Sequence, residues 1–482
     1  MIFSSITFLF YFLPLTLALY YLTPPRFRNI TALLASLLFF AWGAPRFILL
    51  LVVSCALDYW GSRHLHPERH PLPFRRRLLA ALLVLNLGLL GYFKYANFFV
   101  EQLQTVMGWL RLDTFAWRNV ILPIGISFFT FQKISYLVDV YRGEVRPARH
   151  ALDHLLYIAL FPQLIAGPIV RYHDIALQLE HRRTTLDDFL DGIWRFCLGL
   201  AKKVLVANAF GRVADAIFGV PAGELVPVEA WTGLAAYAFQ LYFDFAGYSD
   251  MAIGLGGMMG FRFLENFNFP YASASITEFW RRWHISLGRF MMEYLYVPLG
   301  GNRRGTKKTL RNLWIVFIAS GIWHGASWNF LFWGLWHGLL IATEKRIGAA
   351  RLARVPRLLA VPLTFVLVLL GWVLFRCDNL RHAGKFYGAL FGLLPAGDAR
   401  FFRFAEIAAD RSLWLVALIA IPCSFAPLFI RGIGHRAAST EAPPPQPAGV
   451  LVLRTALAAV LLALVATELF AIGFNPFIYF RF

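Results

Sequence analysis

Charged residues are scarce in this sequence, and acidic residues are the scarcer kind. Charged residues make up 15% of the 482 residues, against about 25% in soluble proteins. By contrast, 59% of the residues are hydrophobic and 17% are aromatic. The 46 Lys and Arg residues outnumber the 27 Asp and Glu residues, which gives a net charge of +19. This composition argues against a soluble domain and indicates a membrane protein.

Cysteine is also scarce, and the motifs of common soluble enzymes are missing. The four cysteines form no C-x-x-C pair and lie in apolar surroundings, so we expect buried thiols rather than disulfides or a zinc site. They are Cys55, Cys197, Cys377 and Cys423. The chain contains no H-E-x-x-H and no G-x-S-x-G sequence, which argues against a zinc protease and a serine hydrolase.

Three further patterns resemble cofactor or metal sites, but each lacks the context that such a site needs. No strand precedes the glycine-rich segment Gly254–Gly260, so helix packing through Gly256 and Gly260 explains it better than a dinucleotide site. His150 and His154 have the spacing of metal ligands, but no further ligand cluster accompanies them. The same holds for three histidines of a polar loop, His64, His66 and His70. We therefore predict no metal and no tightly bound cofactor.

Long apolar runs recur along the whole chain. A bilayer span needs about 20 such residues, and the runs that meet or approach this length include Ile2–Leu22, Ile30–Leu57, Leu78–Phe93, Trp231–Met259 and Leu358–Phe375. We predict an all-α, multi-pass membrane protein with about 10–12 spanning helices. Residues 1–482 are expected to form one membrane-embedded domain, with Ala437–Pro447 as a flexible surface loop.

Basic residues gather in short clusters between the apolar runs. The clusters are Arg75–Arg77, Arg142–Arg149, Lys202-Lys203, Arg303–Arg311 and Lys345–Arg357. The positive-inside rule predicts that they mark cytoplasmic loops. Orientation in the membrane, rather than binding to nucleic acid, therefore explains the positive charge. No basic residue precedes the first apolar run, and Arg26 and Arg28 follow it. This favours an uncleaved first helix with its N-terminus outside.

One histidine lies inside an apolar stretch. His324 belongs to Gly321-Ile322-Trp323-His324-Gly325, and ionisable groups at membrane depth are costly unless they function or have a partner. A desolvated imidazole is neutral near pH 7 and can accept a proton from a hydroxyl group. Trp323, Trp328 and Asn329 are candidates for holding a substrate beside it. The chemistry alone leaves open a structural histidine satisfied by one hydrogen bond.

The second Trp-His-Gly copy contains His337, 13 positions after His324. On one ideal helix the two histidines would lie about 220° apart, so we expect His337 to be structural unless the backbone breaks between them. Only 34 positions separate Arg311 from Lys345. Two spans would need roughly 40 residues and a turn. Either one basic cluster lies on the other side, or the segment is re-entrant, with glycines allowing a break. Those glycines are Gly321, Gly325 and Gly334.

Two further segments carry polar residues. Charges and aromatic residues alternate in Glu278–Glu293, where Trp280 and His284 are i,i+4 neighbours, so an amphipathic helix is expected at the interface or packed inside. Asp244 and Asp250 lie in an apolar helix pattern. They are candidates for substrate binding, although a buried hydrogen-bond anchor to Tyr, Trp or Arg explains them equally simply. Being six positions apart, they do not share a helix face well.

The combination of these stretches resembles the membrane-bound O-acyltransferase family and, within it, the bacterial alginate O-acetyltransferase branch. The matching segments run over nearly the whole chain. They are Met1–Ser5, Leu122–Gln132, Phe161–Ile169, Phe243–Ala252, Phe279–Leu287, Trp323–Gly325 and Phe477–Phe480. The combination is specific, whereas any single piece would be weak. The D-alanine exporters of teichoic-acid pathways are a more distant likeness.

The resemblance implies a ring of helices around a central funnel or tunnel in the bacterial inner membrane. It also implies that His324 is the signature histidine and His284, 40 positions earlier, a second catalytic histidine. Relatives pass an acetyl group from a cytoplasmic donor, expected to be acetyl-CoA, to the outside. There a periplasmic SGNH-hydrolase-like acetyltransferase places it on a polysaccharide. Four basic residues suit the phosphates of such a donor, although a role in topology explains them as well: Arg303, Arg304, Lys307 and Lys308.

The sequence is compatible with two alternative functions. The same chemistry can serve another cell-envelope polymer, such as peptidoglycan, cellulose or teichoic acid. A transporter or channel without acyl chemistry is the other alternative, and the absence of a long internal repeat counts against it.

Overall fold

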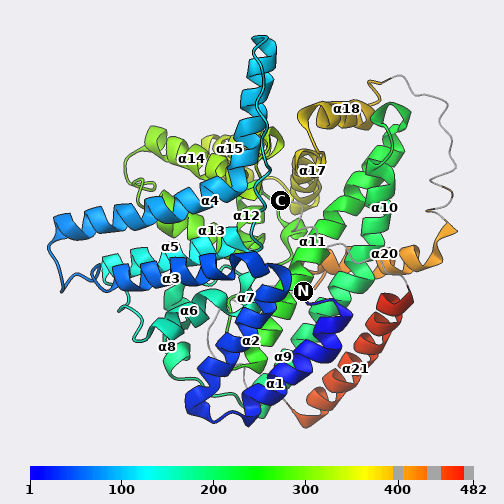
Figure 1. Cartoon of the computed structure of the whole chain (residues 1–482). Coiled ribbons are helices and arrows are strands. Elements are labelled where there is room, and N and C mark those ends of the chain that lie inside the picture. The colour runs from blue at the N-terminus through cyan, green and yellow to red at the C-terminus, as the bar shows by residue number, and fades with distance from the viewer. Residues whose placement is uncertain (395–404, 406, 408, 431–446, 472–482) are drawn as a thin grey trace. The chain divides into compact units, whose positions relative to one another are not determined.

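The computed structural model describes residues 1–394, 405, 407, 409–430 and 447–471 (Figure 1). Within these residues all regular structure is helical and no strand occurs, so the all-α prediction is confirmed. The closing segment Phe477–Phe480 and most of the proline-rich segment Ala437–Pro447 lie outside the described residues.

The chain divides into two compact units. Unit 1 comprises Met1–Ile193 and Ala252–Phe263, and unit 2 comprises Trp194–Met251 and Leu264–Phe482. Helices α9 (Leu186–Ala201) and α11 (Pro227–Met258) run through the boundaries between them. The prediction of one domain over residues 1–482 stays a prediction. The same holds for the predicted ring of helices around a central funnel.

Unit 1 is built from helices of very different length. Beside the first part of α9, its α-helices are α1 (Leu13–Leu22), α2 (Arg28–Gly43), α3 (Ile48–Ser62), α4 (Leu72–Trp109), α5 (Ile126–Arg142), α6 (Ala151–Ala159), α7 (Phe161–Leu164) and α8 (Tyr172–Glu180). A π-helical segment, η1 (Phe8–Phe12), leads into α1. Short 3-10 turns at Pro25–Phe27 and Pro45–Phe47 precede α2 and α3.

A glycine lets α5 begin against α7. Gly125 precedes α5 in the left-handed region, with φ of 76°, where a side chain is disfavoured. A Cβ atom there would also lie 2.5 Å from the carbonyl oxygen of Leu164. The Leu122–Gln132 stretch therefore contains a glycine because of both conformation and space.

A buried ion pair joins the interior of unit 1. Lys133 Nζ of α5 lies 3.1 Å from Asp58 Oδ2 of α3, and both side chains are almost fully buried. Asn86 of α4 donates to the other oxygen of Asp58 at 2.9 Å. Such a pair fixes how three helices meet more than it adds net stability. Nothing in the sequence pattern singled out these three residues.

Unit 2 contains the rest of α9 and α11 and the C-terminal helices. After η4 (Lys202–Ala207), a π-helical segment, they are α10 (Asn208–Phe218), α12 (Ile276–Arg282), α13 (Ile285–Met291), α14 (Thr306–His324), α15 (Trp328–Ile347), α16 (Ala349–Leu352), α17 (Arg357–Arg376), α18 (Leu380–Leu390), α20 (Arg411–Ser424) and α21 (Ala448–Ala471). Lys202 and Lys203 lie in η4, inside the continuous helical run from α9 to α10. The prediction that they mark a loop was wrong, because each pairs with a carboxylate.

Helices α14 and α15 form a hairpin. They lie side by side (Figure 1) and pack against each other more extensively than any other two helices of the described chain. A Cβ atom at Gly334 would lie 3.3 Å from the Cα atom of Gly321 and within contact distance of the Phe317 carbonyl oxygen. The two glycines therefore do not break the helices, as we had considered, but let their backbones approach.

Three helices of the described chain are long and apolar enough to cross a bilayer, namely Leu72–Trp109, Arg357–Arg376 and Gly449–Ala471. Large apolar side chains such as Val84 and Leu87 on α4 and Val452 and Leu453 on α21 are exposed. A surface of this kind needs lipid. The multi-pass membrane prediction is confirmed in this coarse form, and the count of 10–12 spans stays a prediction.

The structure corrects two predictions, one on glycine packing in α11 and one on the burial of the cysteines. Gly260 lies beyond the end of α11 with φ of 81°, so it does not form a helix-packing pair with Gly256. Close approach on α11 instead occurs at Gly247, where a Cβ atom would lie 2.6 Å from the Gly199 carbonyl oxygen. Three cysteines are buried as expected, but Cys423 is exposed.

Candidate functional site

His324 is the last residue of α14, at the corner of the hairpin. The backbone leaves the helix at Gly325, which is extended with φ of −167°, and α15 begins at Trp328. The side chain is buried, with 8% of its surface exposed. Of the two arrangements predicted for this segment, the structure has the one in which the chain reverses its direction next to His324.

Three aromatic rings surround His324. The ring centroids of Trp323, Trp333 and Phe375 lie 4.9, 4.9 and 5.2 Å from its own. All three rings are steeply inclined to the imidazole, at 69°, 86° and 73°. Such edge-to-face contacts are the favourable ones for aromatic pairs. These three contacts therefore orient the imidazole and bury most of its surface.

His284 lies at a second corner, which replaces the single amphipathic helix that we predicted. Helix α12 ends at Arg282 and α13 begins at Ile285. Between them His284 is left-handed, with φ of 46° and ψ of 54°. A non-glycine residue pays conformational energy for this backbone. Trp280 and His284 therefore do not stack along one helix, but the segment is packed inside, since Phe279, Trp283 and Leu287 are buried.

His284 and His324 share one tryptophan. The ring centroid of Trp323 lies 6.3 Å from that of His284 and 4.9 Å from that of His324, so the two imidazoles lie within about 11.2 Å of each other. Only 1% of His284 is exposed. Its Nδ1 lies 3.1 Å from Asn266 Oδ1, and its Nε2 has no hydrogen-bond partner among the described residues.

His337 lies in the same aromatic cluster as His324, which is the case that a break in the backbone between them allows. The helix is broken between His324 and His337, so the angle of about 220° expected for two positions on one ideal helix does not apply. Both imidazoles contact the ring of Trp333, with centroids 4.9 and 5.0 Å away. Trp280 Nε1 lies 3.3 Å from His337 Nδ1 and donates to it. Because Trp280 occupies Nδ1, His337 offers no basic nitrogen and serves to hold Trp280.

The remaining candidates around His324 differ in their surroundings. Trp323 is buried, whereas Trp328 is 47% exposed at the start of α15. Asn329 is buried, and its Nδ2 donates to the Cys377 carbonyl oxygen at 2.6 Å. This bond ties α15 to the end of α17, which carries Phe375. Asn329 thus supports the enclosure through its side-chain amide.

The two aspartates of α11 are both ion-paired. Asp244 Oδ1 lies 2.6 Å from the buried Lys203 Nζ. Asp250 Oδ2 lies 2.6 Å from Lys202 Nζ, and its Oδ1 accepts from Arg195 Nε at 2.7 Å. These contacts favour the anchor explanation, with lysine as the partner that we had not considered. A role in substrate binding stays a prediction.

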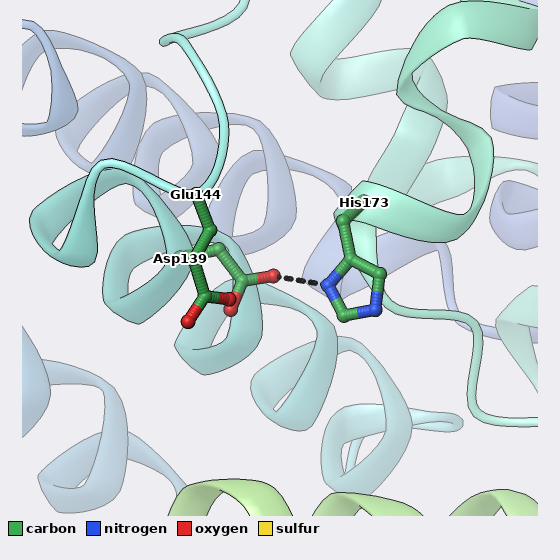
Figure 2. A group of neighbouring side chains, drawn as sticks. All are labelled: Asp139, Glu144 and His173. Carbon is green, nitrogen blue, oxygen red and sulfur yellow. Dashed lines mark hydrogen bonds and ion pairs between the residues drawn. The ribbon is translucent and has the colours of Figure 1, made fainter.

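A separate polar cluster lies in unit 1. One ligand-type atom each from Asp139, Glu144 and His173 lies within 4.8 Å of the others. Figure 2 shows the two carboxylates on one side and the imidazole of His173 facing them. The sequence did not indicate this group, because its members come from α5, the following loop and α8. Its ligand types would suit a divalent metal.

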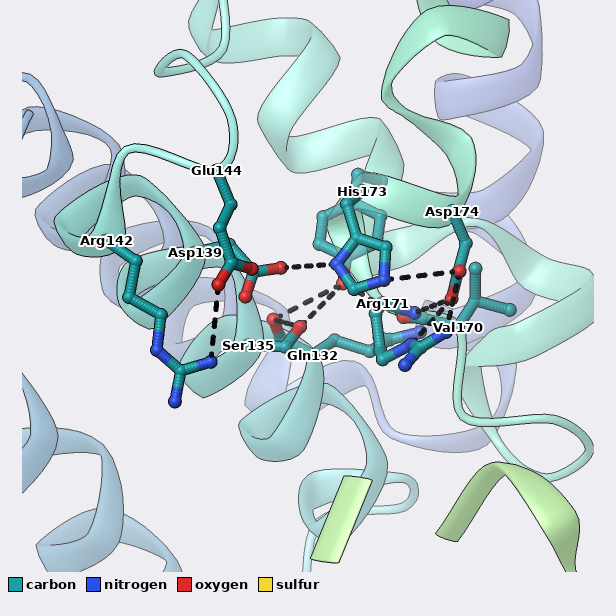
Figure 3. Close-up of polar contacts among 10 residues, drawn as sticks. Gln132, Ser135, Asp139, Arg142, Glu144, Val170, Arg171, His173 and Asp174 are labelled. Carbon is teal, nitrogen blue, oxygen red and sulfur yellow. Dashed lines mark hydrogen bonds and ion pairs between the residues drawn. The ribbon is translucent and has the colours of Figure 1, made fainter. Parts of the chain in front are cut away.

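The carboxylates that contact His173 oppose metal binding by its imidazole. Its Nδ1 lies 2.8 Å from Asp139 Oδ2, and its Nε2 lies 3.4 Å from Asp174 Oδ1. Figure 3 shows the imidazole held between these carboxylates, with Arg142 on the far side of Glu144. The hydrogen bond to Asp139 raises the pKa of His173 above its ordinary 6.5, although partial burial opposes this. A metal would need a deprotonated ring nitrogen, so the cluster favours a proton.

The other histidine groups do not converge on a ligand. His150 is exposed, whereas His154 is fully buried against the ring of Tyr136, with centroids 4.4 Å apart. His64 Nδ1 and His70 Nε2 lie 3.0 Å apart in an exposed pair. The basic residues that we considered for donor phosphates are all exposed: Arg303, Arg304, Lys307 and Lys308.

The comparisons with known proteins identify the family of the chain. The family model described as the membrane-bound O-acyltransferase family matches residues 80–352, which include His284 and His324. The chain is 42% identical over 502 aligned positions to the probable alginate O-acetylase AlgI of Azotobacter vinelandii, covering 100% of both chains.

Two further relatives show the range of names within the family. A probable alginate O-acetylase AlgI of Pseudomonas aeruginosa is 46% identical over 391 positions, which cover 81% of this chain and 75% of that one. The peptidoglycan O-acetyltransferase of Helicobacter pylori is 37% identical over 429 positions, which cover 82% and 80%. From the matched segment and the full-length identity, the chain belongs to the membrane-bound O-acyltransferase family.

Proposed function

We propose that this enzyme passes an acetyl group from a cytoplasmic thioester donor, acetyl-CoA, across the inner membrane for O-acetylation of an exopolysaccharide such as alginate. The observation that carries the proposal is the burial of His324 at the corner of the α14–α15 hairpin, inside three aromatic rings and next to the tryptophan that it shares with His284. The alginate O-acetylase names of full-length relatives support the acceptor class.

The proposed step needs one base and a dry site. His324 takes the proton of an acceptor hydroxyl while that oxygen attacks the acetyl carbonyl carbon. The new C–O bond forms as the C–S bond breaks, and the proton then passes to the leaving thiolate. Because a thioester is wasted if water reaches it, an enclosure of apolar rings is a functional requirement. We assign Trp323 and Asn329 to the walls of this enclosure.

The surroundings of His284 support a second role in the proposed step. Its Nε2 is buried and has no hydrogen-bond partner in the described part of the chain. A basic nitrogen in this condition is suited to accept a hydrogen bond from the acceptor hydroxyl or to share its proton. We propose that His284 orients the hydroxyl and His324 removes the proton.

The proposal includes a partner outside the membrane. A periplasmic SGNH-hydrolase-like acetyltransferase would accept the acetyl group and place it on the polymer. The exposed basic residues near the start of α14, such as Arg303 and Lys307, would meet the donor phosphates on the cytoplasmic side.

The test uses the full-length protein in lipid vesicles with acetyl-CoA labelled in the acetyl group. We expect His324→Ala to lower transfer to an added acceptor by at least about 100-fold, because general-base catalysis contributes roughly 10²–10⁴. His150→Ala is the matched control, since His150 is exposed and makes no side-chain cap bond. Normal transfer by well-folded His324→Ala protein would overturn the proposal.

A second acceptor is favoured by one relative. The Helicobacter pylori protein, named a peptidoglycan O-acetyltransferase, matches 82% of this chain. Offering alginate and peptidoglycan fragments together, with their own partner proteins, would separate the two acceptors. Predominant labelling of peptidoglycan would change the polymer while leaving the acyl chemistry in place.

A further inference from the structure

We propose that Asn266 is a positioning residue that fixes the tautomer of His284, so that its Nε2 carries the lone pair into the site. The inference rests on the proposed function, because it specifies how one of its two histidines is prepared for the reaction. Asn266 did not stand out in the sequence. In the structure it contacts the histidine corner through both its backbone and its side chain.

The backbone of Asn266 holds the corner. Its carbonyl oxygen accepts from the Ile285 N–H at 2.9 Å, and two residues later the Asn268 N–H donates to the Arg282 carbonyl oxygen at 2.9 Å. These two bonds flank His284 and secure its left-handed backbone, with φ of 46°. Strain of this kind persists only where neighbouring contacts determine it.

The orientation of the Asn266 amide follows from its neighbours. The backbone N–H of Ser286, which can only donate, lies 3.2 Å from the atom assigned as Oδ1. The Ser286 hydroxyl also donates to Oδ1, at 2.9 Å. On the other side, Nδ2 lies 3.0 Å from Ser249 Oγ, which can accept. An exchanged amide would place N–H against N–H, so the oxygen must face Ser286 and His284.

The tautomer of His284 follows from that oxygen. Nδ1 of His284 lies 3.1 Å from Asn266 Oδ1. If Nδ1 carried a lone pair, two acceptors would face each other in a buried site, which is unfavourable. Nδ1 must therefore carry the hydrogen, and Nε2 the lone pair. Asn266 and His284 are each only 1% exposed, so no solvent competes for this bond.

An amide suits this position better than a carboxylate. It accepts the Nδ1–H bond without adding a charge, so the imidazole remains neutral until the acceptor hydroxyl arrives. A carboxylate would stabilise the protonated ring and remove the free lone pair. The choice of Asn over Asp therefore keeps Nε2 available as a base.

The tautomer can be measured without activity. Protein labelled with ¹⁵N-histidine gives distinct signals for protonated and unprotonated ring nitrogens, and a His284→Gln sample identifies the signals of His284. We expect a protonated Nδ1 and an unprotonated Nε2 in the wild type. In Asn266→Ala we expect the two tautomers to mix. A protonated Nε2 in the wild type would overturn the inference, whatever the activity is.

Kinetic measurements distinguish a role of Asn266 in positioning His284 from a role in folding. For Asn266→Ala we expect kcat for acetyl transfer to fall roughly 10- to 100-fold with KM little changed, as for other residues that orient a functional histidine. Asn266→Asp keeps the acceptor for Nδ1–H but stabilises the protonated ring, so it should be poorly active at neutral pH and recover most of the activity at higher pH, with the acidic limb of its pH profile moved upward. The matched control is Asn268→Ala, because Asn268 bonds to Arg282 through its own backbone N–H and carbonyl oxygen, which alanine keeps.

The outcomes distinguish this inference from the proposed function. If the wild type transfers acetyl groups and His284→Gln does not, but Asn266→Ala is fully active, only the role of Asn266 fails. If the wild type transfers nothing under any condition, the proposed function fails, and the ¹⁵N signals still decide the tautomer. If Asn266→Asp is as inactive as Asn266→Ala at every pH, Asn266 is structural and the inference fails.

Discussion

His173 joins two helices through a contact with a carboxylate. It lies on α8, and its Nδ1 contacts Asp139 of α5 at 2.8 Å. The hydrogen bond to Asp139 raises the pKa of His173 above 6.5. A group whose pKa is raised by folding adds stability that is fully present below its unfolded pKa and is lost as pH rises through the folded pKa.

We therefore predict that the thermal stability of the purified protein falls as pH rises from about 6.5 through the raised folded pKa of His173. His173→Gln should flatten this dependence, because glutamine keeps a donor but does not titrate. The Tm of both proteins in detergent, measured at several pH values, is the test. His64→Gln serves as the control, since His64 is exposed and lies near no carboxylate in the described contacts. Parallel pH curves for wild type and His173→Gln would contradict the prediction.

The sequence predicted single residues well where membrane cost or family likeness applied to them. His324 and His284 were both predicted, and the structure brings both to the ring of Trp323. Asn266 was not predicted, because it lies in the irregular segment between α11 and α12, where no periodicity points to a particular residue. Its importance depends on a contact with His284, 18 positions away, which only the folded chain reveals.

At the scale of elements, the α14–α15 hairpin depends on two glycines facing each other. A Cβ atom at Gly334 would press on the Phe317 backbone and lie 3.3 Å from the Gly321 Cα atom. Backbone cannot move aside as a flexible side chain can, so we expect overpacking to cost about 1–3 kcal/mol. The hairpin holds His324, so separation of the helices would also loosen the aromatic enclosure.

We predict that Gly334→Ala lowers the Tm and reduces acetyl transfer. Gly384→Ala is the matched control, because Gly384 lies within α18 and a Cβ atom there meets nothing within 4 Å. Alanine should stabilise α18 by about 0.5–1 kcal/mol. Thermal unfolding of the two variants in the same detergent measures the difference. Equal stability of both would show that the hairpin tolerates a wider separation.

The helices themselves were predictable, but their ends were not. The apolar runs predicted helices, and helices are present. The i,i+4 spacing of Trp280 and His284 favoured one continuous helix, yet Asn266 stabilises a corner at His284 through a distant contact. Lys202 and Lys203 resembled a loop by charge, whereas their carboxylate partners on α11 allow them to remain helical.

At the scale of the whole molecule, the distribution of basic residues predicts an orientation of the chain in the membrane. Its net charge of +19 comes from 46 basic and 27 acidic residues. The exposed basic residues include Arg146, in the loop after α5, and Arg303, before α14. The positive-inside rule places such residues in the cytoplasm.

We predict that cysteines replacing Arg146 and Arg303 are labelled by a membrane-impermeant maleimide only from the cytoplasmic side. The exposed Cys423 must first be replaced by serine, so that it does not add signal. Right-side-out and inverted vesicles, compared directly, give the answer. Labelling of either position from outside would refute the predicted orientation.

The membrane class of the molecule was predictable from composition, because apolar residues in such excess can be stable only in lipid. The division into two units was not, since α9 and α11 continue through both boundaries without a linker that the sequence would reveal. The acceptor polymer was not predictable either, because no motif of the sequence distinguishes one polysaccharide from another.

The hairpin also bears on how the protein is made. Helices α14 and α15 are separated only by residues 325–327, so their mutual contacts are local in sequence and form quickly. Trp323, His324 and Trp333 can therefore assemble as soon as this segment leaves the ribosome and enters the membrane. Phe375 arrives later with α17. During synthesis the histidine would have a partly open enclosure, which the last helices then close.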